Sequence, residues 1–113
     1  KLVWGQRSFL FTGDSSIKEE RALKNNSSNL DADVLKIPHH GSKYSTDNTF
    51  LADVLPSAAV ISVGAGNSYG HPNPEVLNLL EKYGIITKRT DTDGDITFLC
   101  DGLNIYFELK NKF

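Results

Sequence analysis

The feature that most constrains the fold is an alternation of short apolar runs with segments of helical periodicity. The apolar runs occupy residues 8–11, 34–37, 58–63 and 85–88, and helical patterns lie between them at 17–23, 47–55 and 74–83. Strands that alternate with helices are typical of α/β folds. Two further strands, 95–100 and 104–109, flank the hairpin turn signal Asp101-Gly102. The sequence therefore predicts an α/β fold with a mixed sheet, covering helices and a C-terminal hairpin.

The length of the chain limits it to one hydrophobic core. With 113 residues, of which 39% are hydrophobic and 23% charged, the chain has the composition of a soluble globular domain. Its net charge of -2 excludes a surface that grips nucleic acid everywhere as a polycation. The longest apolar runs are far shorter than the ~20 residues that span a bilayer. Because the chain starts at Lys1 with no leader pattern, we expect residues 1–113 to be one partial domain of a longer protein.

Several single residues predict where elements end and what they do there. Ser16 and Glu19 have the spacing of a capping box, and Gly84 follows a helical pattern as a C-terminal stop. Cys100 is the only cysteine, which excludes an internal disulfide and any site that needs several thiolates. Its apolar neighbours predict that Cys100 is a small core residue.

The residues able to do chemistry follow three of the predicted strands. Asp14 comes after the first strand, His39 and His40 after the second, and His71 lies in a glycine-rich loop after the third. Functional groups of open α/β sheets gather in loops at the carboxyl ends of strands. The histidine pair is the strongest signal, because Pro38 and Gly41 flank it. Asp14 alone is equally consistent with a helix cap, and His71 alone with a surface histidine.

Taken together, three segments carry a resemblance to a known superfamily. They are FLFTGD at 9–14, DVLKIPHHGS at 33–42 and AVISVGAGNSYGHPNP at 59–74. This set resembles the metallo-β-lactamase fold, and more narrowly the C-terminal hydrolase domain of ComEC-type competence proteins, which internalise DNA. The resemblance covers nearly the whole chain. It implies that the chain is the second half of an αββα sandwich.

The resemblance also implies a role for individual side chains. Asp14 matches the aspartate that bridges two metal ions, and His40 matches a histidine that completes the shell of one metal. His39 is then the catalytic residue that contacts the phosphate or protonates the leaving oxygen. Ser42, Lys43 and His71 are expected to bind substrate, with a helix-capping serine and a solvated lysine as the alternatives for the first two. Tyr69 lies in the same matching segment as His71, without an assigned role.

The family's His-x-His-x-Asp-His segment, which supplies most of the metal ligands, does not occur in these 113 residues. The complete domain is expected to hold two divalent ions, zinc or manganese, whereas the chain alone would hold none tightly. Its partners would be DNA, the missing N-terminal half of the domain and the membrane channel of the parent protein. Because the missing half would cover one apolar face of the sheet, the isolated chain is expected to self-associate.

The implied function is a metal-dependent nuclease domain of a DNA-uptake protein. It would lie on the outer face of the bacterial membrane and degrade the strand that is not imported. Two alternatives stay open on the sequence. One is a phosphodiesterase or phosphocholine esterase that acts on another substrate, and the other is a non-catalytic module that scaffolds the channel or binds a partner.

Overall fold

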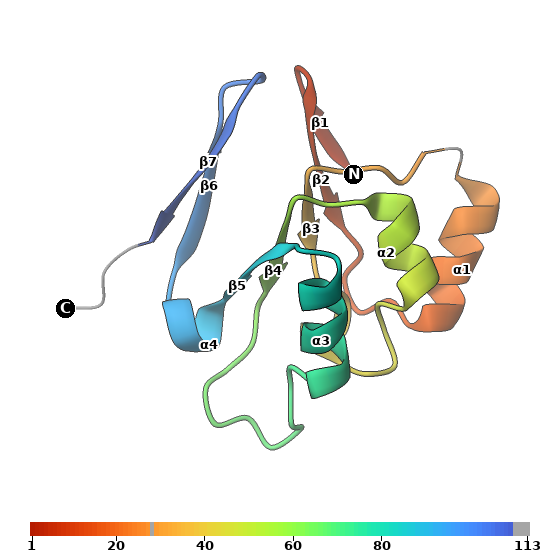
Figure 1. Cartoon of the computed structure of the whole chain (residues 1–113), viewed down its shortest axis with the longest axis vertical. Helices are drawn as coiled ribbons and strands as arrows, with labels where there is room; N and C mark the ends of the chain where they lie inside the picture. The colour runs from red at the N-terminus through yellow and green to blue at the C-terminus, as the bar shows by residue number, and fades with distance from the viewer. Residues whose placement is uncertain (28, 110–113) are drawn as a thin grey trace.

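The computed structural model describes residues 1–27 and 29–109. Figure 1 shows a sheet in the centre, helices on one side of it and a hairpin on the other. In chain order the elements are β1 (Leu2–Trp4), β2 (Arg7–Phe11), α1 (Ile17–Asn26), β3 (Val34–Lys36), the 3-10 turn η1 (Pro38–Gly41), α2 (Asn48–Val54), β4 (Ala58–Ile61), α3 (Pro74–Lys82), β5 (Ile86–Arg89), α4 (Thr90–Asp93), β6 (Ile96–Cys100) and β7 (Ile105–Leu109).

The main sheet has five strands in the order β1-β2-β3-β4-β5. Strand β1 is antiparallel to β2, and the pairs β2–β3, β3–β4 and β4–β5 are all parallel. Strands β6 and β7 form a separate antiparallel hairpin. The predicted α/β class, with a mixed sheet, helices and a C-terminal hairpin, is confirmed.

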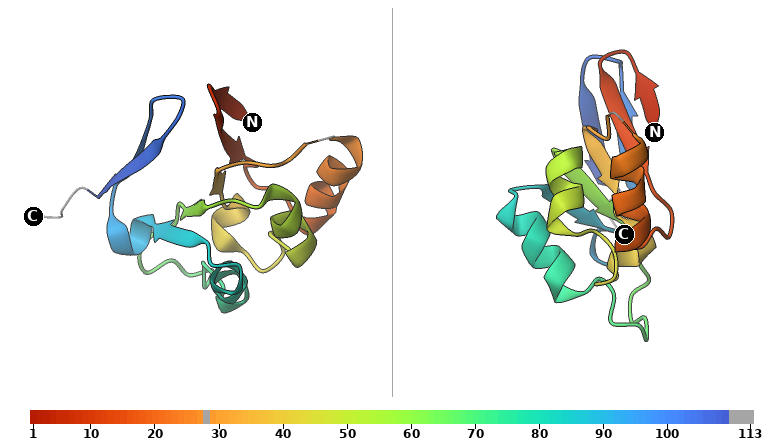
Figure 2. Two further views of the ribbon diagram at one scale, coloured as in Figure 1. Left: turned by 45° about the horizontal axis from the view of Figure 1, so that its top comes forward. Right: turned by 90° about the vertical axis from the view of Figure 1, so that its right-hand side faces the viewer.

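The hydrophobic core lies between the main sheet and helices α1, α2 and α3, which cover one face of the sheet in both views of Figure 2. Leu35 on β3, Leu51 on α2 and Ile61 on β4 are fully buried there. The predicted helix ends are also present. Ser16 and Glu19 form a capping box, and Gly84 follows α3 with a positive φ of 66°. The helical patterns over α2 and α3 therefore mark residues that fill this core, whereas the buried residue of α1 is Glu20.

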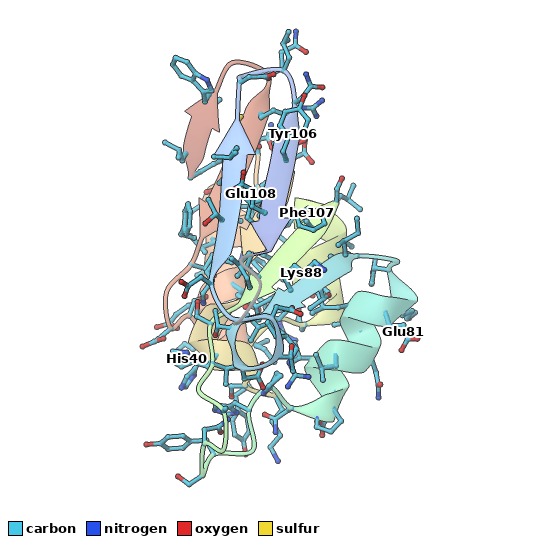
Figure 3. All side chains as sticks on the ribbon, turned by 90° about the vertical axis from the view of Figure 1, so that its left-hand side faces the viewer. His40, Glu81, Lys88, Tyr106, Phe107 and Glu108 are labelled. Carbon is cyan, nitrogen blue, oxygen red and sulfur yellow. The ribbon has the colours of Figure 1, made fainter. Side chains whose placement is uncertain are left out.

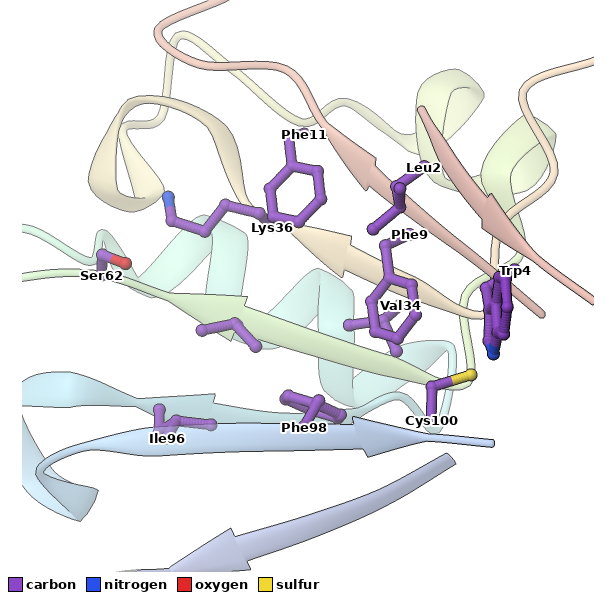
Figure 4. Close-up of a pocket in the computed structure, with 11 residues that line it drawn as sticks. Leu2, Trp4, Phe9, Phe11, Val34, Lys36, Ser62, Ile96, Phe98 and Cys100 are labelled. Atoms are coloured by element: carbon purple, nitrogen blue, oxygen red, sulfur yellow. The ribbon is translucent and has the colours of Figure 1, made fainter. Parts of the chain in front are cut away.

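The opposite face of the sheet is apolar but incompletely covered. A groove of about 610 Å³ runs between this face and the hairpin, and Figure 4 shows Phe9, Phe11 and Phe98 along it. The hairpin bonds to the β1–β2 turn, where the Gln6 N–H donates to the Gly102 carbonyl at 2.7 Å, and Phe98 packs edge-on against Phe9 of β2. Large apolar side chains stay exposed on this side, with Trp4 and Phe11 62% and 60% exposed.

Three details differ from the sequence predictions. Strand β1 was not predicted from the sequence. Residues 90–93, which carry no helical pattern, form the single turn α4. Cys100 is half-buried and lines the groove instead of the core, because β6 packs on the open face of the sheet. Among the described residues, no helix is both long and apolar enough to cross a bilayer.

Candidate functional site

The parallel pairing of β2, β3 and β4 brings the three predicted loops to one edge of the sheet. Asp14 follows β2, the double-histidine loop (residues 38–46) follows β3, and the glycine-rich loop (residues 64–73) follows β4. Figure 3 shows His40 at this end of the sheet. The ring centroid of His39 lies 6.5 Å from that of His40 and 5.9 Å from that of His71. The three histidines of the chain therefore form one cluster, as the sequence predicts.

The backbone of the histidine pair adopts a conformation that residues other than glycine rarely take. His39 has a φ of 48° and His40 a φ of 55°, so two successive residues are left-handed. The His39 N–H donates to the Gly13 carbonyl at 3.0 Å, which joins this loop to the connection that carries Asp14. Backbone conformations of this kind cost about 1–3 kcal/mol each and concentrate at functional sites.

Gly41 allows the double-histidine loop to pack closely on the glycine-rich loop. A Cβ atom at position 41 would lie 2.6 Å from the Pro72 Cβ, and Gly41 has a φ of 80°. The Asn73 N–H donates to the Gly41 carbonyl at 2.9 Å, and the Lys43 N–H donates to the Asn73 side-chain oxygen at 2.7 Å. Only glycine fits this contact, which explains why glycine follows the histidine pair.

The ring of His40 has a defined tautomer. Its Nδ1 lies 2.6 Å from the Ser62 carbonyl oxygen, at the end of β4. Because a carbonyl can only accept, Nδ1 carries the proton and the neutral ring has its lone pair on Nε2. A metal-ligating histidine commonly has its other ring nitrogen bonded to a backbone carbonyl in this way.

The glycine-rich loop is held mainly by one side chain. Asn67 donates to the Gly64 and His71 carbonyls and accepts from the Tyr69 and His71 N–H groups. The ring of Tyr69 stacks on that of His71 at 5.8 Å and 20°, yet Tyr69 is 78% exposed. His71 is half-buried and its Nδ1 has no hydrogen-bond partner among the described residues. The loop thus presents an aromatic ring beside the histidine cluster.

Ser42 and Lys43, both predicted to bind substrate, lie in different surroundings. Ser42 is buried, and its hydroxyl accepts a hydrogen bond from the Tyr44 N–H at 3.2 Å. Its side chain therefore stabilises the interior of the double-histidine loop. Lys43 is exposed, with its ammonium 5.3 Å from the centroid of the Tyr44 ring. The Lys43 cation is therefore accessible to solvent, and contact of Lys43 or Ser42 with a substrate stays a prediction.

The structure adds Lys36, which the sequence analysis did not single out, to the surroundings of Asp14. Lys36 is half-buried at the end of β3, and its ammonium donates to the Ile37 carbonyl at 2.8 Å. Burial lowers the pKa of Lys36, while the attraction of the Asp14 carboxylate opposes that shift. Figure 4 shows Lys36 and Ser62 at the same end of the groove. The signal in the sequence was a charged residue inside an otherwise apolar strand.

Glu20 on α1 is the second residue that the sequence analysis passed over. Its side chain is only 1% exposed, and both carboxylate oxygens lie within hydrogen-bond distance of the Thr46 N–H, at 2.7 and 2.9 Å. Burial raises its pKa to about 7, although the N–H groups of Thr46 and Asp47 act against this shift. Thr46 is the last residue of the double-histidine loop, so Glu20 contacts the C-terminal end of this loop.

Residues 1–27 and 29–109 contain no group of three or more histidine, cysteine, aspartate or glutamate side chains placed to hold a metal ion. Asp14 and His40 therefore do not form a complete metal centre with other side chains of this part of the chain. The convergence of Asp14 and His40 on one cation stays a prediction. The geometry that supports it is the shared edge of the sheet and the tautomer of His40.

Comparison with known proteins finds relatives of much greater length. The chain is 43% identical over 100 residues to ComE operon protein 3 of Bacillus subtilis, 39% over 99 residues to competence protein ComA of Neisseria gonorrhoeae, and 34% over 111 residues to recombination protein 2 of Haemophilus influenzae. These matches cover 86%, 87% and 96% of the chain, but only 13–14% of each relative. No protein-family model matches. The chain is thus homologous to a short part of competence-related proteins of the ComEC type.

Proposed function

We propose that the chain is the C-terminal part of a metal-dependent phosphodiester hydrolase domain, a nuclease, with a metallo-β-lactamase fold. The observation that carries this proposal is the histidine cluster at the carboxyl edge of β2, β3 and β4. The orientation of His40, whose Nε2 lone pair is free, adds to it. The described residues supply no complete ligand set, so the proposal requires further ligands from a segment of the protein outside residues 1–113.

In this proposal Asp14 and His40 belong to the ligand set of two divalent ions, zinc or manganese. An aspartate has two oxygens for two cations, and a neutral imidazole has one lone pair for one cation. When bound, such ions neutralise charge on a phosphate group and activate water. The task of this chain is to hold the two ligands in place. The His39 N–H to Gly13 hydrogen bond does so by joining the two loops that carry them.

The remaining residues of the cluster act on the substrate. His39 is exposed and lies between His40 and His71, where an imidazolium can give its proton to the leaving oxygen. The exposed Lys43 ammonium can pair with a non-bridging phosphate oxygen. His71 and Tyr69 form a stacked pair that a nucleobase can extend. Exposed aromatic rings and cations are the groups that bind single-stranded nucleic acid in general.

The competence-related relatives support DNA as the substrate. We place the chain in a membrane-anchored DNA-uptake protein, on the outer face of the bacterial membrane, where it degrades the strand that is not imported. Its partners are DNA, the N-terminal half of the hydrolase domain and the membrane channel. A phosphodiester or phosphocholine ester other than DNA is the competing substrate class.

The proposal is tested by comparing the isolated chain with the complete domain. Both are incubated with single-stranded DNA, duplex DNA and a phosphocholine ester, in manganese or zinc, and their metal content is measured. We expect the complete domain to bind metal and cleave DNA, and the isolated chain to do neither. Metal-dependent cleavage by the isolated chain that is lost in Asp14→Ala would show that the site is complete within these residues. Cleavage of the ester alone by the complete domain would exclude the nuclease.

The assignment of the two adjacent histidines has its own test in the complete domain. Because His40 has its Nε2 lone pair free for a cation, His40→Ala should lower the bound metal. His39→Ala should retain the metal and lower turnover by roughly 10²–10⁴-fold, the usual contribution of an acid–base group. Metal analysis by mass spectrometry distinguishes the two, and the opposite pattern would exchange their roles.

A further inference from the structure

Glu20 occupies a place that a carboxylate rarely holds. It is the only ionisable side chain among the fully buried residues in the described part of the chain, and none of the ion pairs found there includes it. The charged groups around it are Glu19, Arg21 and Lys24 on its own helix, Asp47 at the N-cap of α2 and Asp53 on α2. Arg21 pairs with Asp47, and Lys24 with Asp53. Its hydrogen bonds are therefore with backbone, a costly arrangement that calls for an explanation.

The hydrogen bonds of Glu20 are made with Thr46, whose backbone has an unfavourable conformation. Thr46, 3% exposed, has a φ of 61°, which is rare for a β-branched residue. Its N–H donates to the Glu20 carboxylate. Two residues earlier, the Tyr44 carbonyl accepts the Ile17 N–H of the same helix at 2.9 Å. The end of the double-histidine loop is thus fixed to α1 at two points.

A continuous set of short contacts leads from Thr46 back to the histidines. The Ser45 hydroxyl lies 3.2 Å from the Pro38 carbonyl and 2.9 Å from the Ser42 carbonyl. The Ser45 N–H donates to Ser42, and the Ser42 N–H donates to the His39 carbonyl. The His39 N–H in turn donates to the Gly13 carbonyl, next to Asp14. Both ends of this set are attached to the β2–α1 segment, one at Gly13 and the other at Glu20.

We propose that Glu20 is a positioning residue of the candidate site: its buried side chain holds the end of the double-histidine loop against α1, and so keeps His39 and His40 in register with Asp14. Its importance for activity rests on the proposed hydrolase function, whereas the positioning itself does not. The role depends on the reach and the acceptor oxygen of the side chain. The negative charge is dispensable, because burial opposes it.

This dependence separates two substitutions. Glu20→Gln keeps the length and one acceptor oxygen but loses the charge, whereas Glu20→Asp keeps the charge and loses about one methylene of reach. Glu19→Gln and Glu19→Asp are matched controls on the neighbouring residue. The exposed Glu19 carboxylate accepts a hydrogen bond from the Ser16 N–H at 2.6 Å. Amide hydrogen exchange of the chain, followed by NMR at one pH, reports the Thr46 and His39 N–H groups separately. The measurement needs neither metal nor activity.

We expect Glu20→Asp to lower the protection of both the Thr46 and the His39 amides by roughly tenfold, which is the effect of one lost hydrogen bond. Glu20→Gln should keep both within about threefold of the wild type, and the Glu19 variants should leave both unchanged. A fall at Thr46 without a fall at His39 would limit Glu20 to joining α1 and α2 and overturn the proposal. A fall in Glu20→Gln equal to that in Glu20→Asp would overturn the role of the acceptor. Either result is independent of whether the complete domain cleaves DNA.

Discussion

The two loops that carry the histidines are built in opposite ways. The double-histidine loop has a buried interior, in which Ser42, Ser45 and Thr46 are 1–3% exposed and bonded to backbone or to the buried Glu20. The glycine-rich loop is mostly exposed, and Asn67 is the side chain that makes most of its hydrogen bonds. The difference teaches that the His39–His40 pair is held rigidly by the fold, whereas His71 reaches the same cluster on a more open segment.

The sharpest test of this contrast compares a glycine in each loop. Gly41→Ala places a methyl group 2.6 Å from the Pro72 Cβ in a left-handed conformation, and should cost about 2–5 kcal/mol. Gly66→Ala has a similar φ of 68° with nothing within 4 Å, and should cost only about 1–2 kcal/mol. Urea unfolding of both variants measures the difference. Equal losses would show that the close approach of the two loops contributes nothing to stability.

The second test uses the acid buried beneath the double-histidine loop. Because Glu20 has a pKa raised from 4.5 to about 7 in the folded chain, the folded state binds its proton more tightly than the unfolded state. The free energy of unfolding should therefore fall as the pH rises from about 4.5 to 7, by up to about 3 kcal/mol, and then stay level. Glu20→Gln removes this dependence. Denaturant midpoints of the two proteins across pH 5–8 check the prediction, and parallel curves would contradict it.

The smallest expected effect compares one serine from each loop. Ser45→Ala removes a buried hydroxyl that bonds to the Pro38 and Ser42 carbonyls, and should cost about 1–2 kcal/mol. Ser68→Ala alters an exposed side chain and should change stability by less than about 0.5 kcal/mol. Thermal unfolding of the pair is sufficient. If Ser68→Ala costs as much as Ser45→Ala, the glycine-rich loop is more tightly organised than its exposure indicates.

The sequence was sufficient to predict the frame of the site. Apolar runs located β2, β3 and β4, and the rule that parallel strands end at one edge placed the loops that carry Asp14, His40 and His71 at the same edge of the sheet. The hydrophobic periodicity also located α1, α2 and α3 within a few residues. These predictions succeeded because each depends on a short stretch of chain or on a general rule of sheets.

The contacts that support the site were not predictable in the same way. Glu20 and Thr46 are 26 residues apart, and an isolated glutamate in a helix is normally solvated. The left-handed conformation of His39 and His40 depends on the anchors at both ends of the loop, because neither residue favours it alone. The prediction that Cys100 is a core residue was wrong because the hairpin packs on the open face of the sheet, which the local sequence around Cys100 does not indicate.

The left-handed histidines also set a direction for laboratory evolution. Glycine adopts the same φ without penalty, so replacing His39 by glycine relieves about 1–2 kcal/mol of backbone cost while removing the imidazole. At His40 the lost hydrogen bond to the Ser62 carbonyl offsets part of the same gain. A library selected only for thermal resistance therefore gains by losing these rings, and one selected for turnover gains by keeping them. Positions 39 and 40 are where the two selections diverge, and the frequency of glycine there records which pressure a lineage has experienced.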